Sequence, residues 1–222
     1  MRVRGENEKA VADFGKAIEI DPKNPDAYSG RGGANLGLGN YYGAAKDLSK
    51  ALELNPEDSI AFDNRITSYQ AQGSYDKVIA DCTVAIKKKQ KDPRYNLYNY
   101  YQQRGRAYLR KGEYDKALMD SDAIVAGHYL DVSAPEDTSV LYELRGETYA
   151  HKKEYVKAIK ECTKAIEADP ASPAAYRWRA ESYYAIGEYK KASYDVERAL
   201  ELFPGLQSKM QTLIDSLKTS GY

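Results

Sequence analysis

Cysteine and histidine are the residues best suited to nucleophilic, redox or metal chemistry, and this chain of 222 residues has two of each: Cys82, Cys162, His128 and His151. A zinc site needs about four clustered ligands, and no spacing here matches one. No phosphate-binding loop, GxSxG or HExxH motif is present. We therefore predict no enzyme activity, no metal and no cofactor, and we expect both cysteines to be buried core residues rather than a redox pair.

Arginine recurs at a regular interval, and an acidic residue follows each arginine by sixteen positions. Successive arginines are separated by 34, 39, 41 and 34 residues. A guanidinium fork can serve two carboxylates, so we predict a partly buried ladder that fixes the register between units more than it adds net stability. The alternative is an anion-binding stripe. The predicted ladder alternates in the order Asp13, Arg31, Asp47, Arg65, Asp81, Arg104, Asp120, Arg145, Glu161, Arg179, Asp195.

The arginines belong to a longer pattern that predicts pairs of helices. An aromatic residue stands three positions before each arginine and a tyrosine ten positions after it, and prolines such as Pro56 end the second helix. Each unit reads as helix, glycine turn, helix and proline stop. This resembles the tetratricopeptide repeat (TPR) family over nearly the whole chain. The resemblance implies an all-α, right-handed α-solenoid of antiparallel helix pairs. The turn residues are Gly39, Gly73, Gly112, Lys153 and Gly187.

The two long steps indicate insertions before the first helices of units three and four, which we predict to begin early, near Asp92-Pro93 and near Ser133 and Pro135. The chain also starts in mid-unit. We interpret this start as a truncation, with a natural half-repeat cap or a face covered by another chain as alternatives. The predicted segments are a half unit (5–24), units 25–58, 59–92, 93–132, 133–172 and 173–205, and a C-terminal capping helix (206–220).

The resemblance also implies a protein-binding groove lined by the first helices, which would hold an extended peptide or a helix of a partner. One subgroup of the family grips a chaperone's C-terminal carboxylate with Lys, Asn and Arg residues. Asn64 matches one Asn, but the basic members are missing, so we predict no carboxylate clamp. The first unit's face is nearly bare, with glycines at 30, 33 and 37. The predicted groove residues are Asn64, Gln102, Gln103, Arg106, Arg110, Glu143, Glu147, Arg177, Trp178, Glu181 and Tyr184.

Two alternative functions stay open at this point. The segment Lys87–Lys91 with Tyr95–Tyr101 combines cations and aromatic rings that could bind RNA, and the exposed N-terminal half unit could mediate self-association. The 33 basic residues equal the 33 acidic ones, which argues against a dedicated nucleic-acid binder. No run of about 18 apolar residues is present, so we expect no membrane insertion and a soluble protein, cytoplasmic rather than exported.

Overall fold

The computed structural model describes residues 2–90, 97–129 and 134–221. These residues form α-helices joined by short turns, with one 3-10 turn and no strand. The chain divides into two compact units, Met1–Lys87 and Lys88–Tyr222. The first unit holds α1 (Arg2–Ile20), α2 (Pro25–Gly37), α3 (Tyr41–Leu54), α4 (Ser59–Ala71) and most of α5 (Tyr75–Lys89). The second unit holds α6 (Tyr98–Arg110), α7 (Tyr114–Ala126), α8 (Pro135–His151), α9 (Tyr155–Ala168), α10 (Pro173–Ala185), α11 (Tyr189–Leu202), η1 (Pro204–Leu206) and α12 (Gln207–Thr219).

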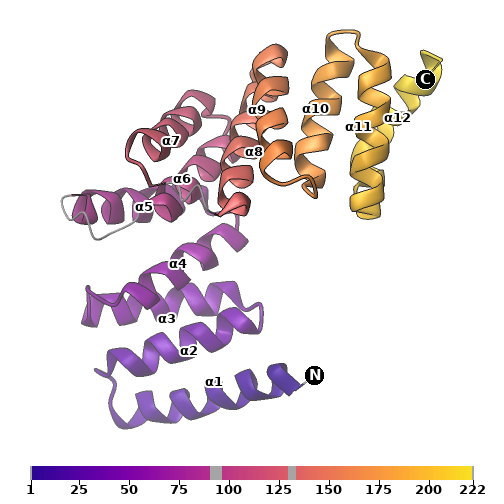
Figure 1. Cartoon of the computed structure of the whole chain (residues 1–222). Coiled ribbons are helices and arrows are strands. Elements are labelled where there is room, and N and C mark those ends of the chain that lie inside the picture. The colour runs from indigo at the N-terminus through magenta and orange to yellow at the C-terminus, as the bar shows by residue number, and fades with distance from the viewer. Residues whose placement is uncertain (1, 91–96, 130–133, 222) are drawn as a thin grey trace. The chain divides into compact units, whose positions relative to one another are not determined.

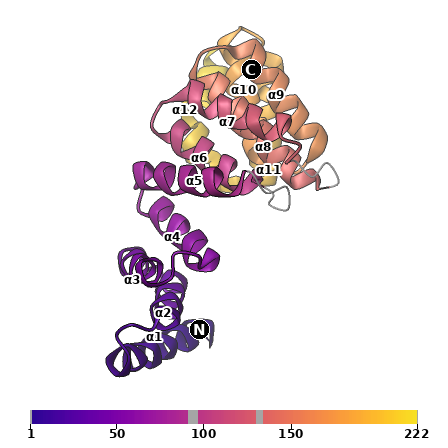
Figure 2. The ribbon, with the colours of Figure 1, turned by 90° about the vertical axis from the view of Figure 1, so that its left-hand side faces the viewer.

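Within each unit, consecutive helices pack side by side as antiparallel pairs (Figure 1). In the first unit α2 lies between α1 and α3, and α4 packs on α3 (Figure 2). In the second unit α6 pairs with α7, α8 with α9 and α10 with α11, and α10 also packs on α9. Among the helices that the structure describes, none is long and apolar enough to span a membrane.

Capping residues and turn glycines set the ends of the helices. Asn24 and Ser172 accept hydrogen bonds from the first-turn amides of α2 and α10, each of which begins with proline. The turn glycines predicted from the repeat adopt positive φ, for example +77° at Gly39, a conformation that costs glycine no steric strain. Lys153 occupies the same turn position with φ of +61°. A lysine there carries strain that glycine would not.

Three glycines of α2 are explained by close packing of neighbouring helices. A Cβ added at position 30 would lie 2.3 Å from the Phe14 ring, one at 32 would lie 2.6 Å from Leu48, and one at 37 would lie 2.5 Å from the Asn7 amide. The prediction that this face is bare is therefore wrong for two of its three glycines, because Phe14 and Asn7 of α1 occupy the space. At Gly33 the nearest such atom, on Asn64, is 3.8 Å away.

The first helix that follows the insertion is longer than usual in the fourth unit but not in the third. α8 has 17 residues and begins with Pro135, whereas α6 has 13 residues, the same length as α2, α4 and α10. The prediction of a long first helix in the third unit is therefore wrong: the helix begins at Tyr98, after the buried, non-helical Leu97. The Tyr98 hydroxyl donates a 2.8 Å hydrogen bond to the Asp137 carbonyl in the first turn of α8. The predicted helix starts at Asp92-Pro93 and Ser133 lie outside the described residues.

The C-terminal helix closes the core of the second unit. Met210 and Leu217 of α12 are buried in one cluster with Tyr176 of α10 and Val196 of α11, and Leu206 of the 3-10 turn joins them. The apolar stripe of α12 thus covers the surface that α10 and α11 would otherwise expose, which positions the residues of α10 described below.

Candidate protein-binding site

Each arginine of the repeat pairs with the acid sixteen residues later, on the second helix of its own repeat. Arg179 donates from Nε to Asp195 Oδ2 at 2.7 Å and from Nη2 to Oδ1 at 2.8 Å, and Arg31 makes the same two bonds to Asp47 at 2.8 Å. These are bidentate, charge-assisted hydrogen bonds. The remaining pairs are Arg65 with Asp81, Arg104 with Asp120, and Arg145 with Glu161, with shortest distances of 2.7–2.9 Å.

The second contact of the arginine differs from the predicted alternation. Arg65 donates from Nη1 to Ser49 Oγ at 3.4 Å, and Arg179 donates from Nη1 to Thr163 Oγ1 at 3.2 Å. Both acceptors lie on the preceding helix, two positions after the acid that the ladder would use. Arg145 likewise pairs with Asp122 rather than with Asp120.

The start of the predicted ladder is also absent. On α1 the position that corresponds to Ser49 and Thr163 is Gly15, where an added Cβ would lie 4.0 Å from Arg31 Nη1. Asp13 makes no hydrogen bond or ion pair with Arg31 in this first part of the described chain. Arg65 and Arg179 therefore reach the preceding helix through a hydroxyl and Arg145 reaches it through Asp122, while the acid sixteen residues after each arginine pairs within its own repeat.

Burial offsets much of the attraction within these pairs. Burial raises the pKa of the Asp120 carboxyl, and Arg104 only partly counters this effect. The pKa of Asp81 is raised for the same reason. In these two pairs desolvation of the carboxylate opposes the Coulomb attraction, so the expectation that the pairs orient helices more than they add net stability stays a prediction.

In four of the repeats a lysine covers the tyrosine that follows the arginine by four positions, a contact that sequence reasoning missed. The lysine stands eight residues after the tyrosine, and an alignment of the five repeats would have revealed this column. Lys Nζ lies 5.0–5.5 Å from the ring centroid, within the range of cation–π attraction. The four pairs are Tyr69–Lys77, Tyr108–Lys116, Tyr149–Lys157 and Tyr183–Lys191.

Several predicted groove residues of the second unit form one polar and aromatic cluster on α6, α8 and α10. Arg110 Nη1 donates to Glu147 Oε1 at 3.0 Å, and the His151 Nε2 lies 4.0 Å from the same oxygen. The His151 ring is 5.1 Å from Trp178, and the guanidinium of Arg177 lies 4.4 Å from the Trp178 ring. Trp178 is only 8% exposed, so these neighbours hold the indole against the helices.

The same surface contains a cation without an ion pair. Arg106 is half-buried, and it makes no hydrogen bond or ion pair to any residue of the described segments. Its positive charge lowers the pKa of Glu143, although burial raises that pKa more strongly. Glu143 accepts a hydrogen bond from the Ser172 hydroxyl, the capping residue of α10. We call the six residues Arg106, Arg110, Glu143, Glu147, Arg177 and Trp178 the first-helix surface.

The other five predicted groove residues are not part of the first-helix surface as defined, although Glu181 contacts it. Tyr184 packs on Tyr189, with ring centroids 5.3 Å apart, and belongs to the core around α12. Glu181 pairs with Arg177 at 2.9 Å. Gln102 and Gln103 are half-buried on α6, and Asn64 is half-buried on α4 of the first unit.

The two cysteines lie in the core. Cys82 and Cys162 are fully buried and are not joined in a disulfide, and burial raises the pKa of the Cys162 thiol far above its usual range. His128 lies at the end of α7 with φ of +52°. Within the described ranges, no group of three or more His, Cys, Asp or Glu side chains could hold a metal ion.

The basic and aromatic segment is also largely packed. Tyr98 and Tyr100 are 5% and 6% exposed, and Lys89 Nζ donates to the Tyr100 hydroxyl at 2.8 Å. Lys91 and Tyr95 lie outside the described residues. The rings that can be placed are therefore not free to stack on bases.

The fold and the repeated Arg–acid pairs define a helical repeat protein. Four models of the TPR repeat match the chain, at residues 2–39, 25–58, 103–173 and 173–206. The chain belongs to the tetratricopeptide repeat family. Comparison with curated protein sequences gives no match.

Three solved structures with a similar fold are distant in sequence. The yeast Tom70 crystal structure is 22% identical with a TM-score of 0.66; the match covers 95% of this chain, which spans only 43% of the Tom70 chain. The C-terminal part of a TPR repeat-containing protein from Cytophaga hutchinsonii is 20% identical with a TM-score of 0.68, covering 96% of this chain and 80% of that one. YrrB, described as a TPR protein with an unusual peptide-binding site, is 17% identical with a TM-score of 0.59, covering 86% and 92%.

Proposed function

We propose that this chain is a non-catalytic protein-interaction scaffold that binds an extended peptide or a partner helix on the first-helix surface. TPR folds typically serve as interaction scaffolds, and YrrB, which has a similar fold, carries an unusual peptide-binding site. The observation that carries the proposal is Arg106, a half-buried cation without an ion pair among the described residues. Arginine at a partly desolvated position is a frequent source of binding energy.

The charge of the first-helix surface favours a peptide of mixed composition. Arg110 and Arg177 are already paired with Glu147 and Glu181, so they contribute hydrogen-bonding groups rather than net positive charge. Arg106 is the cation left to receive a carboxylate or a backbone carbonyl of the partner. Since one cation does not make a clamp for a terminal carboxylate, we propose that binding is independent of a free peptide C-terminus.

The alternative RNA-binding function has no supporting observation. Of its aromatic residues in the described segments, Tyr98 and Tyr100 are buried and Tyr101 is half-buried and stacked on Tyr129, and base stacking requires an exposed ring. We therefore propose protein partners only.

The test selects binders from a random peptide library against the full chain and maps where they bind. A photocrosslinking residue at Gln103, next to the first-helix surface, is expected to capture the selected peptides. The same residue at Met119, which is 68% exposed on α7, is the matched control and is expected to capture none. Arg106→Ala should weaken binding by about tenfold, the effect of losing one charge-assisted hydrogen bond, and amidation of the peptide C-terminus should change nothing.

Crosslinking from Met119 but not from Gln103, or full affinity in Arg106→Ala, would contradict the proposed surface. A strong preference for a free C-terminal carboxylate would contradict the exclusion of a clamp while leaving the interaction function intact.

A further inference from the structure

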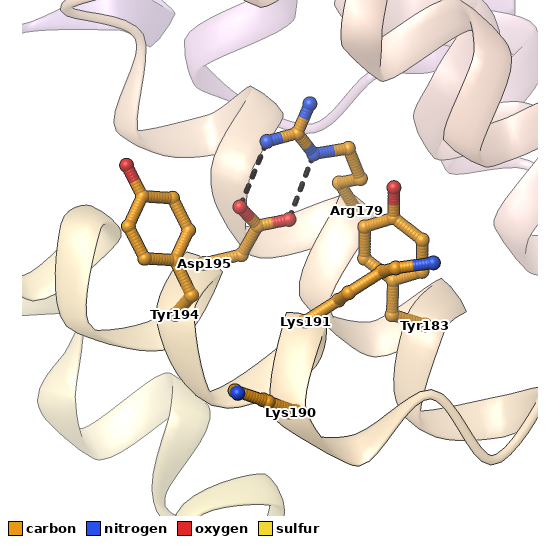
Figure 3. A pocket seen from close by; sticks show the side chains of 6 residues that line it. All are labelled: Arg179, Tyr183, Lys190, Lys191, Tyr194 and Asp195. Atoms are coloured by element: carbon orange, nitrogen blue, oxygen red, sulfur yellow. Dashed lines mark hydrogen bonds and ion pairs between the residues drawn. The ribbon is translucent and has the colours of Figure 1, made fainter.

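A second candidate surface lies on α10 and α11, on the other side of α10 from the first-helix surface. Arg179 and Tyr183 are rotated by about 200° around the α10 axis from Arg177 and Glu181, because each residue of an α-helix advances by about 100°. A cavity of about 360 Å³ opens there. Figure 3 shows the side chains that line it. They are Arg179, Tyr183, Lys190, Lys191, Tyr194 and Asp195.

The charges of this cavity are unequal. It holds three cations and one carboxylate, and Asp195 is fully engaged by Arg179. Lys191 pairs with Glu188 at 3.1 Å and covers Tyr183, as the corresponding lysine does in other repeats. Lys190 is exposed and makes no ion pair or hydrogen bond to the described chain. The excess positive charge therefore rests on Lys190.

The repeat itself does not account for Lys190. The position varies among the repeats. It is Tyr42 in α3 and Val156 in α9, and in α5 and α7 it is an acid, Asp76 or Asp115, in the first helical turn, where a negative charge is favourable. A lysine in the first turn of α11 is unfavourable for the helix by the same reasoning. Capping and helix stability thus explain the two acids but leave the lysine without a structural role.

Arg179 and Tyr194 supply the other groups that a ligand would need. A guanidinium has five N–H donors, and Arg179 directs one to Thr163 and two to Asp195, which leaves donors for an acceptor in the cavity. The Tyr194 side chain is 58% exposed at the edge of the cavity, a large exposure for an aromatic side chain that no packing contact requires. An exposed ring of this kind offers a stacking surface.

We propose that this cavity binds an oxyanion carried next to an aromatic residue in a partner peptide. The oxyanion accepts hydrogen bonds from Lys190 and from Arg179, and the aromatic ring of the peptide stacks on Tyr194. Carboxylate side chains and phosphorylated tyrosine share this chemistry. The site is separate from the first-helix surface, so it would let the chain hold two partner segments at once.

The experiment titrates three short capped peptides into the full, ¹⁵N-labelled chain at low salt and follows amide shifts by NMR. The probes are Gly-Glu-Tyr-Glu-Gly, its Gly-Gln-Tyr-Gln-Gly analogue, and the Gln analogue with phosphotyrosine. We expect at least one anionic probe to shift the amides of Lys190 and Tyr194, and the uncharged analogue to bind at least about tenfold more weakly. Tighter binding of the glutamate probe assigns a carboxylate ligand, and tighter binding of the phosphotyrosine probe assigns a phosphoryl ligand; both support the site.

Variants test which residues are responsible. Lys190→Glu should abolish binding of the anionic probe, whereas Lys209→Glu, the same charge change on exposed α12, should not alter it. Tyr194→Phe should keep the affinity and Tyr194→Ala should lose it severalfold. The proposal is overturned if no anionic probe shifts these amides, or if the uncharged Gly-Gln-Tyr-Gln-Gly probe binds as tightly as the anionic probes. It is also overturned if the Lys190→Glu variant binds the anionic probe as tightly as the unaltered chain does. All three positions are exposed, and unchanged urea midpoints verify the fold.

Discussion

Replacing Arg179 by leucine isolates the energetics of the Arg–acid pairs. The substitution removes two hydrogen bonds of 2.7 and 2.8 Å to a carboxylate that is only 1% exposed, and a third of 3.2 Å to Thr163. It leaves the Asp195 carboxylate buried with no counter-charge. Breaking one side of a buried pair costs about 3–5 kcal/mol, so we expect Arg179→Leu to lower the free energy of unfolding by that amount.

Urea denaturation followed by circular dichroism measures this loss. Arg198→Leu is the control, because Arg198 pairs with Glu201 on the exposed side of α11 and should cost less than about 1 kcal/mol. Adding Asp195→Leu to Arg179→Leu should restore most of the stability, since an apolar pair avoids the buried charge. If Arg179→Leu costs less than about 1 kcal/mol, or if the double variant is no more stable than the single one, the reasoning fails.

Three further outcomes follow from packing and backbone geometry. Gly146→Ala places a Cβ 2.4 Å from Cys162 Sγ and should cost about 1–3 kcal/mol in urea denaturation; adding Cys162→Ala should recover part of this loss, and additive losses would contradict the contact. Lys153→Gly should raise the free energy of unfolding by up to about 1 kcal/mol, and with it the thermal midpoint, because φ at this position is +61°. A lower midpoint would show that contacts of the lysine side chain outweigh the backbone strain. Cys82 and Cys162, both fully buried, should react with a thiol-specific disulfide reagent only after denaturation, and fast labelling of the folded chain would contradict their burial.

The repeat pattern predicted the helix pairs and the turns because both depend on local chemistry. A positive φ favours glycine, so glycines eight residues after the arginine located four turns, and the register then placed Lys153 in the fifth. The acid sixteen residues after each arginine was found in the same way. These features involve residues of one helix pair, whose geometry is set by the turn that joins them.

Contacts between successive pairs were harder to predict. The ladder assumed that Arg65 would contact Asp47, whereas it contacts Ser49, because the rotation of one pair against the next brings a position two residues further along to the guanidinium. The prediction that the face of α2 is bare was wrong for a similar reason. The sequence shows that side chains are missing there, but it does not show that Phe14 of the neighbouring helix fills the space. The length of an insertion likewise gives no information on where the helix after it begins, as Tyr98 shows.

The first-helix surface was predicted as a list of residues, and the structure adds how they are engaged. Trp178 was predicted to line the groove, and the structure shows that it is held between Arg177 and His151. Arg106 became the main candidate for binding a partner because Glu147 pairs with Arg110 and Glu143 accepts its hydrogen bond from Ser172. Such differences depend on which side chains reach one another across helices, and helical spacing alone does not determine this.

The hydrogen bonds that Arg65 and Arg179 make to the preceding helix affect which segments can be exchanged between repeat proteins. Arg65 and Arg179 each join two helices of one repeat to a hydroxyl on the second helix of the repeat before it. A repeat cut at its own ends and moved elsewhere would leave that hydroxyl behind, whereas the paired acid recurs in every repeat. The segment that can be exchanged between homologous arrays is therefore offset: it starts with a second helix and ends after the next first helix, so that arginine and hydroxyl travel together. Chimeras joined within the glycine turns should keep these bonds, whereas a chimera joined at the proline stop before Arg65 or before Arg179 should lose one.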